Sequence, residues 1–509
     1  MSAFHRYVFY RDFIAIALIT LIFCSCSVKR SAVTGIAKDN ADGFDKERVF
    51  DQNGSSAKVA EKLSKADLQE QKLRAVFKDI LENRLADLPF PEQISRFYEK
   101  GNYKLLMVPR FLPDHQLQIL PEYLNHADRH GLDSSLFLAA DLKKELDEVS
   151  DYKLADTLKI HRRLAKLELT FLSALIKYSI ALQYGITNPA RIYNHYAVPT
   201  LLPDSNFVMR VFEIHNLKNY LDSIQPNDKT YRALQKALIR AGDIKNSLHN
   251  GVTDSLKKQT LIVNMERLRW KNKPAGQKFV LVNIADFSLD VIDKGKSVLH
   301  MNVCVGEPGD KQTPQIGSMI RLVQINPVWN IPHSIARNEI SRYAAADRYY
   351  LSDHHIRTFK KGKLIRDTES IDWASADISD YSFQQQPGSE NSLGRIKFLF
   401  DNASSVYLHD TPVRTVFKQK MRAISHGCVR VEKPLDLASA LFAKDEKYKL
   451  IKSGMQRGYP RAKFISLPQQ IPVRLLYYTA WLDDKGMIRF TKDIYGLDKV
   501  VYEAMKNFN

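Results

Sequence analysis

The stretch that decides this chain's fold and chemistry reads Tyr407-Leu-His409-Asp-Thr-Pro412 and resumes as Ile424-Ser-His426-Gly-Cys428-Val-Arg430-Val431. A cysteine nucleophile reacts as its thiolate, so it needs a base or a positive field, partial exposure and donors for an oxyanion. His409 ends a predicted strand and is the candidate base for Cys428. The backbone N–H groups of Gly427 and Cys428 are candidate oxyanion donors.

The segment that joins these two motifs is basic. Between Thr411 and Val431 there is no acidic residue, and the basic ones are Arg414, Lys418, Lys420, Arg422 and Arg430. A positive field lowers the pKa of a thiol and attracts substrates that carry carboxylates. We therefore expect a reactive Cys428 whose pKa is lowered.

Other interpretations of the same residues stay open. A single cysteine is most often a small buried hydrophobic residue. A metal site of His409, His426 and Cys428 would need a further ligand that no CxxC or HExxH pattern supplies, so no metal is expected. A Cys304–Cys428 disulfide depends on geometry that sequence does not give. Cys304 lies in an apolar run and is expected to be an inert core thiol.

Composition limits the class of protein. The chain has 509 residues, 75 Lys and Arg, 57 Asp and Glu, a net charge of +18 and 44% hydrophobic residues. This excludes a wholly disordered chain and a polytopic membrane protein. Half of the net charge, +9, falls in residues 274–509. Because the charge is spread evenly, we expect an anionic surface or substrate and no nucleic acid. Four cysteines exclude a disulfide scaffold.

The N-terminus predicts export. Basic residues precede the uncharged run Phe13–Phe23, which is too short to span a membrane but suits a signal peptide. Residues 1–26 resemble a lipoprotein signal with Cys26 as the acylated residue; a cleaved signal or an uncleaved anchor is the alternative. Residues 27–64 are polar and are expected to form a tether. Ser27 favours the outer over the inner membrane, so we expect a periplasmic protein with a lipid anchor.

Hydrophobic periodicity divides the rest of the chain. Residues 65–273 are predicted to be helical, with one long helix over Leu154–Tyr184, which contains no Gly or Pro. Residues 274–480 contain short β-branched runs typical of strands. We expect residues 341–380 to be an insertion able to cover a site, with an ordinary surface loop as the alternative. Residues 481–509 are expected to pack back on the helical part. The predicted fold class is α+β, multidomain.

The motifs together resemble the L,D-transpeptidases of the bacterial cell wall, whose YkuD-type domain carries a His, a spacer and then Ser/Thr-His-Gly-Cys. Fifteen residues separate His409 from Ser425 here. Other segments point to the larger YcbB-like subgroup: Asn264–Trp270, Gln312-Thr-Pro314, Asn326–Pro332, Gln386–Phe398 and Asp493–Gly496. The peptidoglycan-binding module of larger relatives is not expected, because only Tyr231–Asn264 is available for it.

The resemblance implies roles for individual residues. Cys428 is the nucleophile, and the backbone carbonyl of Asp410 holds His409. Gly427 and Tyr407 help the oxyanion, and Ser425 and His426 shape the loop. Arg430 and Trp329 are expected to contact substrate, with support of the loop as the alternative for Arg430. No cofactor is implied.

The expected activity is cross-linking of peptidoglycan. A thioester on Cys428 would form as the terminal D-Ala leaves a stem tetrapeptide, and a second stem would accept the acyl group. The alternatives are an L,D-carboxypeptidase, an endopeptidase or a hydrolase that detaches wall-linked lipoproteins, and a non-catalytic wall-binding lipoprotein. The expected partners are stem peptides, a membrane and peptidoglycan synthases.

Overall fold

The computed structural model describes residues 52–113, 115–150, 157–243, 251–272, 276–443, 445–456 and 461–507. These residues form two compact units. The first unit contains the described residues up to Ile186 and those from Leu202 to Leu248. The second unit contains Thr187–Leu201 and the described residues from His249 to Asn507. The predicted signal peptide, Cys26 and the tether as far as residue 51 lie outside the described residues. Within the described ranges no helix is long and apolar enough to cross a membrane.

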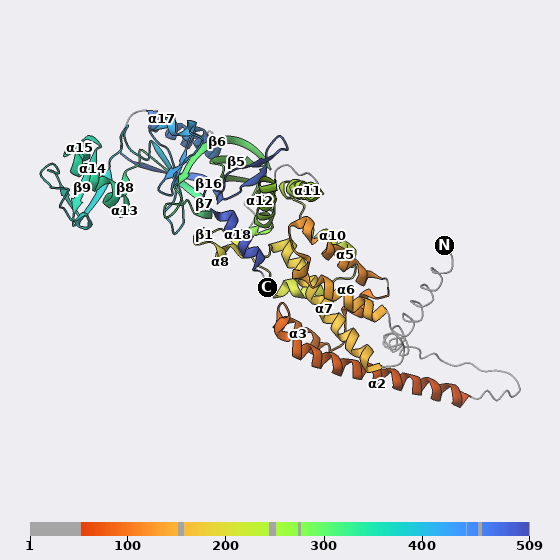
Figure 1. The fold of residues 1–509 in the computed structure, drawn as a ribbon. Helices are drawn as coiled ribbons and strands as arrows, with labels where there is room; N and C mark the ends of the chain where they lie inside the picture. The colour runs from red at the N-terminus through yellow and green to blue at the C-terminus, as the bar shows by residue number, and fades with distance from the viewer. Residues whose placement is uncertain are drawn as a thin grey trace, which may run out of the picture. The chain divides into compact units, whose positions relative to one another are not determined.

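The first unit is helical and is built around α7, Thr157–Tyr184, the predicted long helix (Figure 1). Nearly all of its residues from Leu164 to Leu182 are buried, and α2 and α6 pack on it. The other helices of this unit are α2 Gln52–Arg84, α3 Pro91–Lys100, α4 Met107–Phe111, α5 Ile119–Asn125, α6 Ala139–Ser150, α9 Ser205–Phe212, α10 Leu217–Ser223 and α11 Lys229–Asp243.

One buried carboxylate ties α7 to the start of α4. Glu168 accepts hydrogen bonds from the Tyr98 hydroxyl at 2.7 Å and from the backbone N–H groups of Leu106, Met107 and Val108 at 2.6–2.8 Å. Burial raises the pKa of Glu168, and these four donors oppose that shift. The free N–H groups at the beginning of α4 are thereby satisfied inside the unit.

The second unit is built on one sheet that closes on itself. Its strand order is β1-β7-β12-β13-β15-β6-β5-β4-β16, with β16 also paired to β7 and β14 paired to β6. Its inward-facing Val, Ile, Leu and Phe side chains form the core. The strands are β1 Tyr196–Ala197, β4 Lys278–Asn283, β5 Ser288–Asp293, β6 Lys296–Gly306, β7 Gln315–Ile325, β12 Ile396–Phe400, β13 Leu408–His409, β14 Ala423–Ser425, β15 Val429–Val431 and β16 Lys463–Leu476.

Helices and two small two-stranded sheets complete this unit. The helix α16 packs against β6 and β16, and α12 packs against α18. These elements are α8 Pro189–Ile192, α12 Gly251–Arg269, α16 Pro434–Phe442, α17 Glu446–Gln456 and α18 Leu497–Lys506, with the strand pairs β2 Thr200–Leu201 with β3 Lys271–Asn272 and β17 Ala480–Leu482 with β18 Ile488–Phe490.

The predicted insertion is larger and more ordered than expected. Residues 329–385, the inserted module, contain a four-stranded sheet and a separate hydrophobic core that includes Leu351, Trp373 and Phe383 (Figure 1). The alternative of an ordinary surface loop for residues 341–380 is wrong, because β9 and β10 lie there. These strands are short, and one buried position is the polar Thr358, which weakens the apolar alternation. The elements are β8 Trp329–Ile331, α13 His333–Ile335, α14 Ser341–Ala346, α15 Tyr350–Asp353, β9 Ile356–Lys360, β10 Lys363–Ile365 and β11 Tyr381–Gln385.

Three predicted boundaries differ from the structure. The helix α2 begins at Gln52, so the last part of the expected tether, residues 52–64, is helical. The helix α12 and residues 187–201 belong with the β-rich unit, although the predicted boundary lay at residue 273. In the C-terminal segment, α18 packs on α8 and α12 within the β-rich unit. Buried polar contacts join α12 to α18, which explains why both helices belong with the β-rich unit.

Candidate active site

The register of β13 and β15 brings the two predicted motifs together. These strands run parallel, with Leu408 opposite Val429 and His409 opposite Arg430. Cys428 directly precedes β15, at the level of Tyr407, and the Val429 N–H donates to the Tyr407 carbonyl at 3.1 Å. The thiol and the imidazole therefore lie on neighbouring strands at the same end of β15.

His409 is held as a neutral imidazole. It is 5% exposed, and its Nδ1–H donates to the backbone carbonyl of Asp410 at 2.6 Å. Because a carbonyl oxygen only accepts a hydrogen bond, the single proton of the neutral ring lies on Nδ1. Nε2 therefore keeps its lone pair. Burial lowers the pKa of His409 to about 3, and the charges of Arg430 and Lys397 add to this effect. No described residue hydrogen-bonds Nε2, which is left available to accept a proton.

The Asp410 side chain fixes the carbonyl that orients His409. Its carboxylate accepts from the backbone N–H groups of Arg395 at 2.9 Å and Thr411 at 2.7 Å, and from Arg414 Nη2 at 2.5 Å. Gly394 has a φ of 59°, and a Cβ there would come within 2.4 Å of Asp410 Cγ. A side chain at this position would therefore displace the Asp410 carboxylate.

The surroundings of the Cys428 thiol shift its pKa in opposite directions. Burial raises its pKa, while Tyr407, Lys397 and Arg430 act against that shift. Tyr407 does so through hydrogen bonds from both its backbone and its side chain. The expectation of a lowered thiol pKa is therefore wrong in its net direction, because desolvation outweighs the positive field.

Of the five basic residues expected to supply the positive field, only Arg430 is among the charges that act on the thiol. Arg414 binds the Asp410 carboxylate, and Arg422 donates to the Val303 carbonyl at 3.1 Å. The charges that act on the thiol belong to Arg430 and to Lys397, which was not predicted as a site residue. Lys397 pairs with His409 across β12 and β13, and its ammonium lies 5.2 Å from the Tyr407 ring centroid.

The loop Ser425–Cys428, called here the nucleophile loop after the role proposed below for Cys428, is shaped by Ser425. Its hydroxyl donates to the Cys428 carbonyl at 2.6 Å and accepts from the Gly427 N–H at 3.2 Å. The Gly427 N–H, an expected oxyanion donor, is thus already engaged. The Cys428 N–H has no acceptor among the described residues. Gly427 has a φ of 113°, a conformation that favours glycine.

Comparison with known proteins gives the family. Residues 277–446 match the L,D-transpeptidase catalytic domain family, YkuD, and residues 92–238 match the Scaffold domain family. The chain carries an L,D-transpeptidase catalytic domain. A Haemophilus influenzae protein named "Putative L,D-transpeptidase" is 29% identical over 310 residues. That alignment covers 60% of this chain and 61% of the relative, so the chain spans less than two thirds of the relative's length.

His426, in the loop that carries Cys428, connects this loop to the inserted module. Its Nε2–H donates to Glu339 Oε1 at 2.5 Å, and Lys311 Nζ lies 4.0 Å from the same oxygen. Glu339 was not predicted, since its approach depends on how the module folds. Trp329 lies in β8, packed against the core of the module. The Arg430 guanidinium has no polar partner within the described ranges.

The alternatives to a thiol nucleophile can be compared with the geometry. Both Cys304 and Cys428 are free, so the structure contradicts the disulfide. Cys304 is fully buried, and burial raises its pKa to about 11, as expected for an inert core thiol. Among the described residues, no group of three or more His, Cys, Asp and Glu side chains is placed to hold a metal ion.

Proposed function

We propose that this protein is a peptidoglycan L,D-transpeptidase in which Cys428 is the nucleophile and His409 the proton carrier. The observation that supports the proposal is that the β13–β15 register places a partly exposed thiol next to the strand that carries a neutral imidazole, whose Nδ1–H is held by the Asp410 carbonyl. A nucleophile beside an oriented base is the arrangement that acyl transfer requires.

In the first half-reaction, Cys428 Sγ attacks the carbonyl between the third residue of a stem tetrapeptide and its terminal D-Ala. The thiol proton passes to His409 Nε2 as the S–C bond forms. The tetrahedral intermediate then collapses, the C–N bond breaks, and the His409 imidazolium gives its proton to the departing D-Ala amine. The donor stem is left as a thioester on Cys428, and His409 is neutral again.

In the second half-reaction, an amine on the third residue of another stem attacks the thioester. Neutral His409 takes a proton from that amine as the C–N bond forms, and the thiol leaves with the proton returned to it. The product joins two third-position residues. Arg430 and Lys397, both close to the thiol, are suited to bind a carboxylate of either stem.

Two donors are available for the oxyanion of each intermediate. The Cys428 N–H is free of protein acceptors within the described ranges, and the Tyr407 hydroxyl already hydrogen-bonds the thiol. Gly427 is a weaker candidate than the sequence suggested, because its N–H is bound by Ser425 Oγ. We assign the main role to Cys428 and Tyr407.

The setting of the reaction is also a proposal. Export, acylation of Cys26 and a periplasmic location, on the outer rather than the inner membrane, rest on residues outside the described ranges. The net charge of +18 suits an anionic wall, and peptidoglycan synthases are natural partners for a cross-linking enzyme. We further propose that the inserted module is a lid over Cys428, supported by its Glu339 contact to His426.

The test is release of D-Ala from a purified disaccharide tetrapeptide. We expect Cys428→Ala to lower the rate by at least about 10³-fold and His409→Ala by at least about 10²-fold. Cys304→Ala is the matched control and should retain the activity, because that thiol is buried in the core. Unchanged release by the Cys428 or His409 variant would refute the mechanism.

The products identify the acceptor. Mass spectrometry of muropeptides should show dimers joined through their third residues. Tripeptides without dimers would indicate a carboxypeptidase, and loss of existing cross-links an endopeptidase. Release of a lipoprotein from the wall would indicate a detaching hydrolase. A carbapenem adduct on Cys428 excludes a non-catalytic wall-binding protein, since binding needs no reactive thiol.

A further inference from the structure

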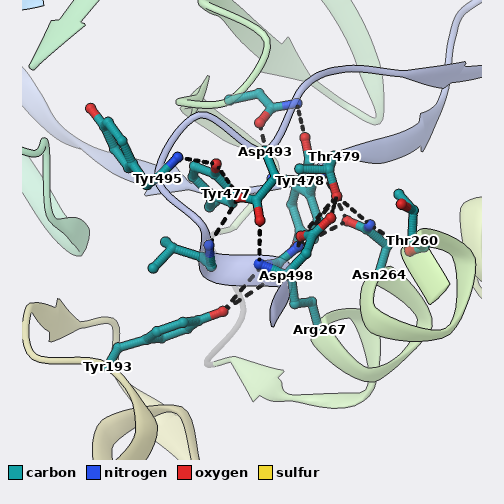
Figure 2. A network of polar contacts seen from close by, with 12 residues as sticks. Tyr193, Thr260, Asn264, Arg267, Tyr477, Tyr478, Thr479, Asp493, Tyr495 and Asp498 are labelled. Carbon is teal, nitrogen blue, oxygen red and sulfur yellow. Dashed lines mark hydrogen bonds and ion pairs between the residues drawn. The ribbon is translucent and has the colours of Figure 1, made fainter. Parts of the chain in front are cut away.

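Three segments that are distant in the sequence meet behind the nucleophile loop. They are Asn264–Trp270, Gln312–Pro314 and Asp493–Gly496, none of which has a part in the chemistry above. In the structure they form one connected set of polar contacts, and Figure 2 shows its outer part, from Tyr495 through Asp493 to Asp498 and Arg267. Its inner end is a hydrogen bond to Gly427, next to Cys428.

The inner end of this set is Thr313, whose side chain is buried. Its hydroxyl donates to the Gly427 carbonyl at 2.8 Å and accepts from the Gly306 N–H at 2.8 Å. Thr313 is 3% exposed, so water does not replace these bonds easily. The end of β6 and the nucleophile loop are therefore joined through one hydroxyl.

Tyr495 hydrogen-bonds the Gly306 carbonyl and the Thr313 backbone N–H. Its hydroxyl donates to the Gly306 carbonyl at 2.6 Å and accepts from the Thr313 N–H at 3.2 Å. A Cβ on Gly306 would lie 1.8 Å from the Lys311 carbonyl oxygen, so the backbones are in close contact here. Gly306, Thr313 and Tyr495 thus form a clamp, called here the Thr313–Tyr495 clamp.

The outer end fixes Tyr495. Its N–H donates to the Tyr477 hydroxyl at 3.0 Å, which in turn donates to Asp493 Oδ1 at 2.6 Å (Figure 2). Asp493 also accepts from the Asp498 N–H at 2.9 Å, at the start of α18. Asp498 forms a buried ion pair with Arg267 of α12 at 2.6 Å.

Planarity of the peptide bond gives this clamp a chemical consequence. The Gly427 carbonyl and the Cys428 N–H belong to one trans peptide unit and point in opposite directions. A hydrogen bond that holds the carbonyl therefore also aims the N–H. Gly427 adopts a φ of 113°, and a glycine can rotate this unit at little cost when nothing holds it.

We propose that Thr313 and Tyr495 are positioning residues that aim the Cys428 N–H at the oxyanion. This inference rests on the proposed function, since it assumes acyl transfer at Cys428. The clamp touches neither the sulfur nor His409, so it should affect stabilisation of the oxyanion and leave the intrinsic reactivity of the thiol unchanged. An oxyanion donor is effective only when it is directed at the developing charge.

The experiment compares two reagents on the full chain. A carbapenem acylates Cys428 through an oxyanion, whereas iodoacetamide alkylates the same thiol without one. Rates are followed by mass spectrometry. We expect Thr313→Val to slow acylation by about 10- to 100-fold and to change alkylation less than about twofold. Thr313→Ser keeps the hydroxyl and should restore acylation to within about threefold of the unsubstituted protein.

Tyr495→Phe provides an independent variant. It keeps the ring that stacks on Tyr477 but removes the hydroxyl, and we expect acylation to slow by about 3- to 10-fold. Tyr502→Phe is the matched control on α18, because no described residue hydrogen-bonds its hydroxyl, and it should change neither rate. Alkylation of the buried Cys304 reports any unfolding. If Thr313→Val unfolds, Tyr495→Phe decides the question.

The outcomes separate the two proposals. If the unsubstituted protein forms no carbapenem adduct on Cys428, the proposed function fails and this inference falls with it. If that adduct forms and Thr313→Val or a folded Tyr495→Phe reacts at the unsubstituted rate, only the positioning role is overturned. An equal loss with both reagents would show that the clamp merely supports the fold.

Discussion

Burial moves the pKa values of the two reacting side chains in opposite directions, and each is left in its neutral form. The His409 pKa falls to about 3, and that of Cys428 rises above its ordinary value. Both shifts favour a neutral thiol and a neutral imidazole over a thiolate–imidazolium pair. In the mechanism proposed above, the proton moves from sulfur to Nε2 as the new bond forms, and Lys397 and Arg430 help to stabilise the transient negative charge.

The protonation states predict an unusual pH profile. Because His409 is neutral from about pH 4 upwards, acylation of Cys428 by a carbapenem should change less than about threefold between pH 5 and pH 8. Alkylation by iodoacetamide requires the thiolate, so over the same range it should rise by nearly tenfold per pH unit. The measurement is both rates as a function of pH. An acylation rate that fell steeply below pH 6.5 would mean that His409 has an ordinary pKa.

At the scale of the element, the short strands β13 and β15 explain how much of the site the sequence could predict. His409 and Cys428 were identifiable because each lies in a local motif at a strand end. Lys397 was missed because its approach depends on the pairing of β12 with β13. The sign of the Cys428 pKa shift was missed because burial, unlike the number of nearby charges, is a property of the assembled sheet.

The inserted module shows the same limit. The sequence indicated an insertion over residues 341–380, but the four strands of the module are short and pair over distances that periodicity does not reveal. Glu339 therefore gave no local signal, although it reaches His426 at 2.5 Å. The helical first unit was easier to predict, since the α7 pattern is continuous over many turns.

The Glu339–His426 contact makes a prediction about the module as a lid. Both side chains are about one third exposed, so the contact should be worth about 0.5–1 kcal/mol. We expect Glu339→Gln to raise KM for the tetrapeptide by about two- to fivefold with little change in kcat. His426→Ala should do the same, and the double variant should be no worse than either alone.

The control for these three variants is Glu369→Gln, which removes a carboxylate of the module that forms no hydrogen bond or ion pair with the described residues. Its KM should stay at the unsubstituted value. Additive effects of the Glu339 and His426 substitutions would show that the two residues act independently, and the lid would then need another point of contact with the nucleophile loop.

At the scale of the whole molecule, the second unit is closed by contacts between segments far apart in the chain. The Arg267–Asp498 pair links α12 to α18 across 231 positions, and Asn264 and Thr479 hydrogen-bond within the same buried group (Figure 2). The family match begins at residue 277 and ends at 446, so both helices lie outside it. They nevertheless complete the hydrogen bonding of the catalytic unit, which explains why the compact unit is longer than the matched domain.

This buried ion pair therefore predicts how the second unit responds to substitution. Asp498→Ala leaves the Arg267 guanidinium, whose side chain is 2% exposed, without its carboxylate, and should destabilise the unit by about 3–5 kcal/mol. Glu503→Ala on the same helix removes an exposed partner of Lys506 and should cost less than about 0.5 kcal/mol. Urea unfolding followed by alkylation of Cys304 measures the free energy of unfolding of both variants. Cys304 becomes reactive only when the β-rich core opens, so the measurement is separate from unfolding of the helical unit. Equal midpoints for the two variants would mean that α18 contributes little to the core, whereas the expected gap makes α12 and α18 integral parts of the catalytic unit.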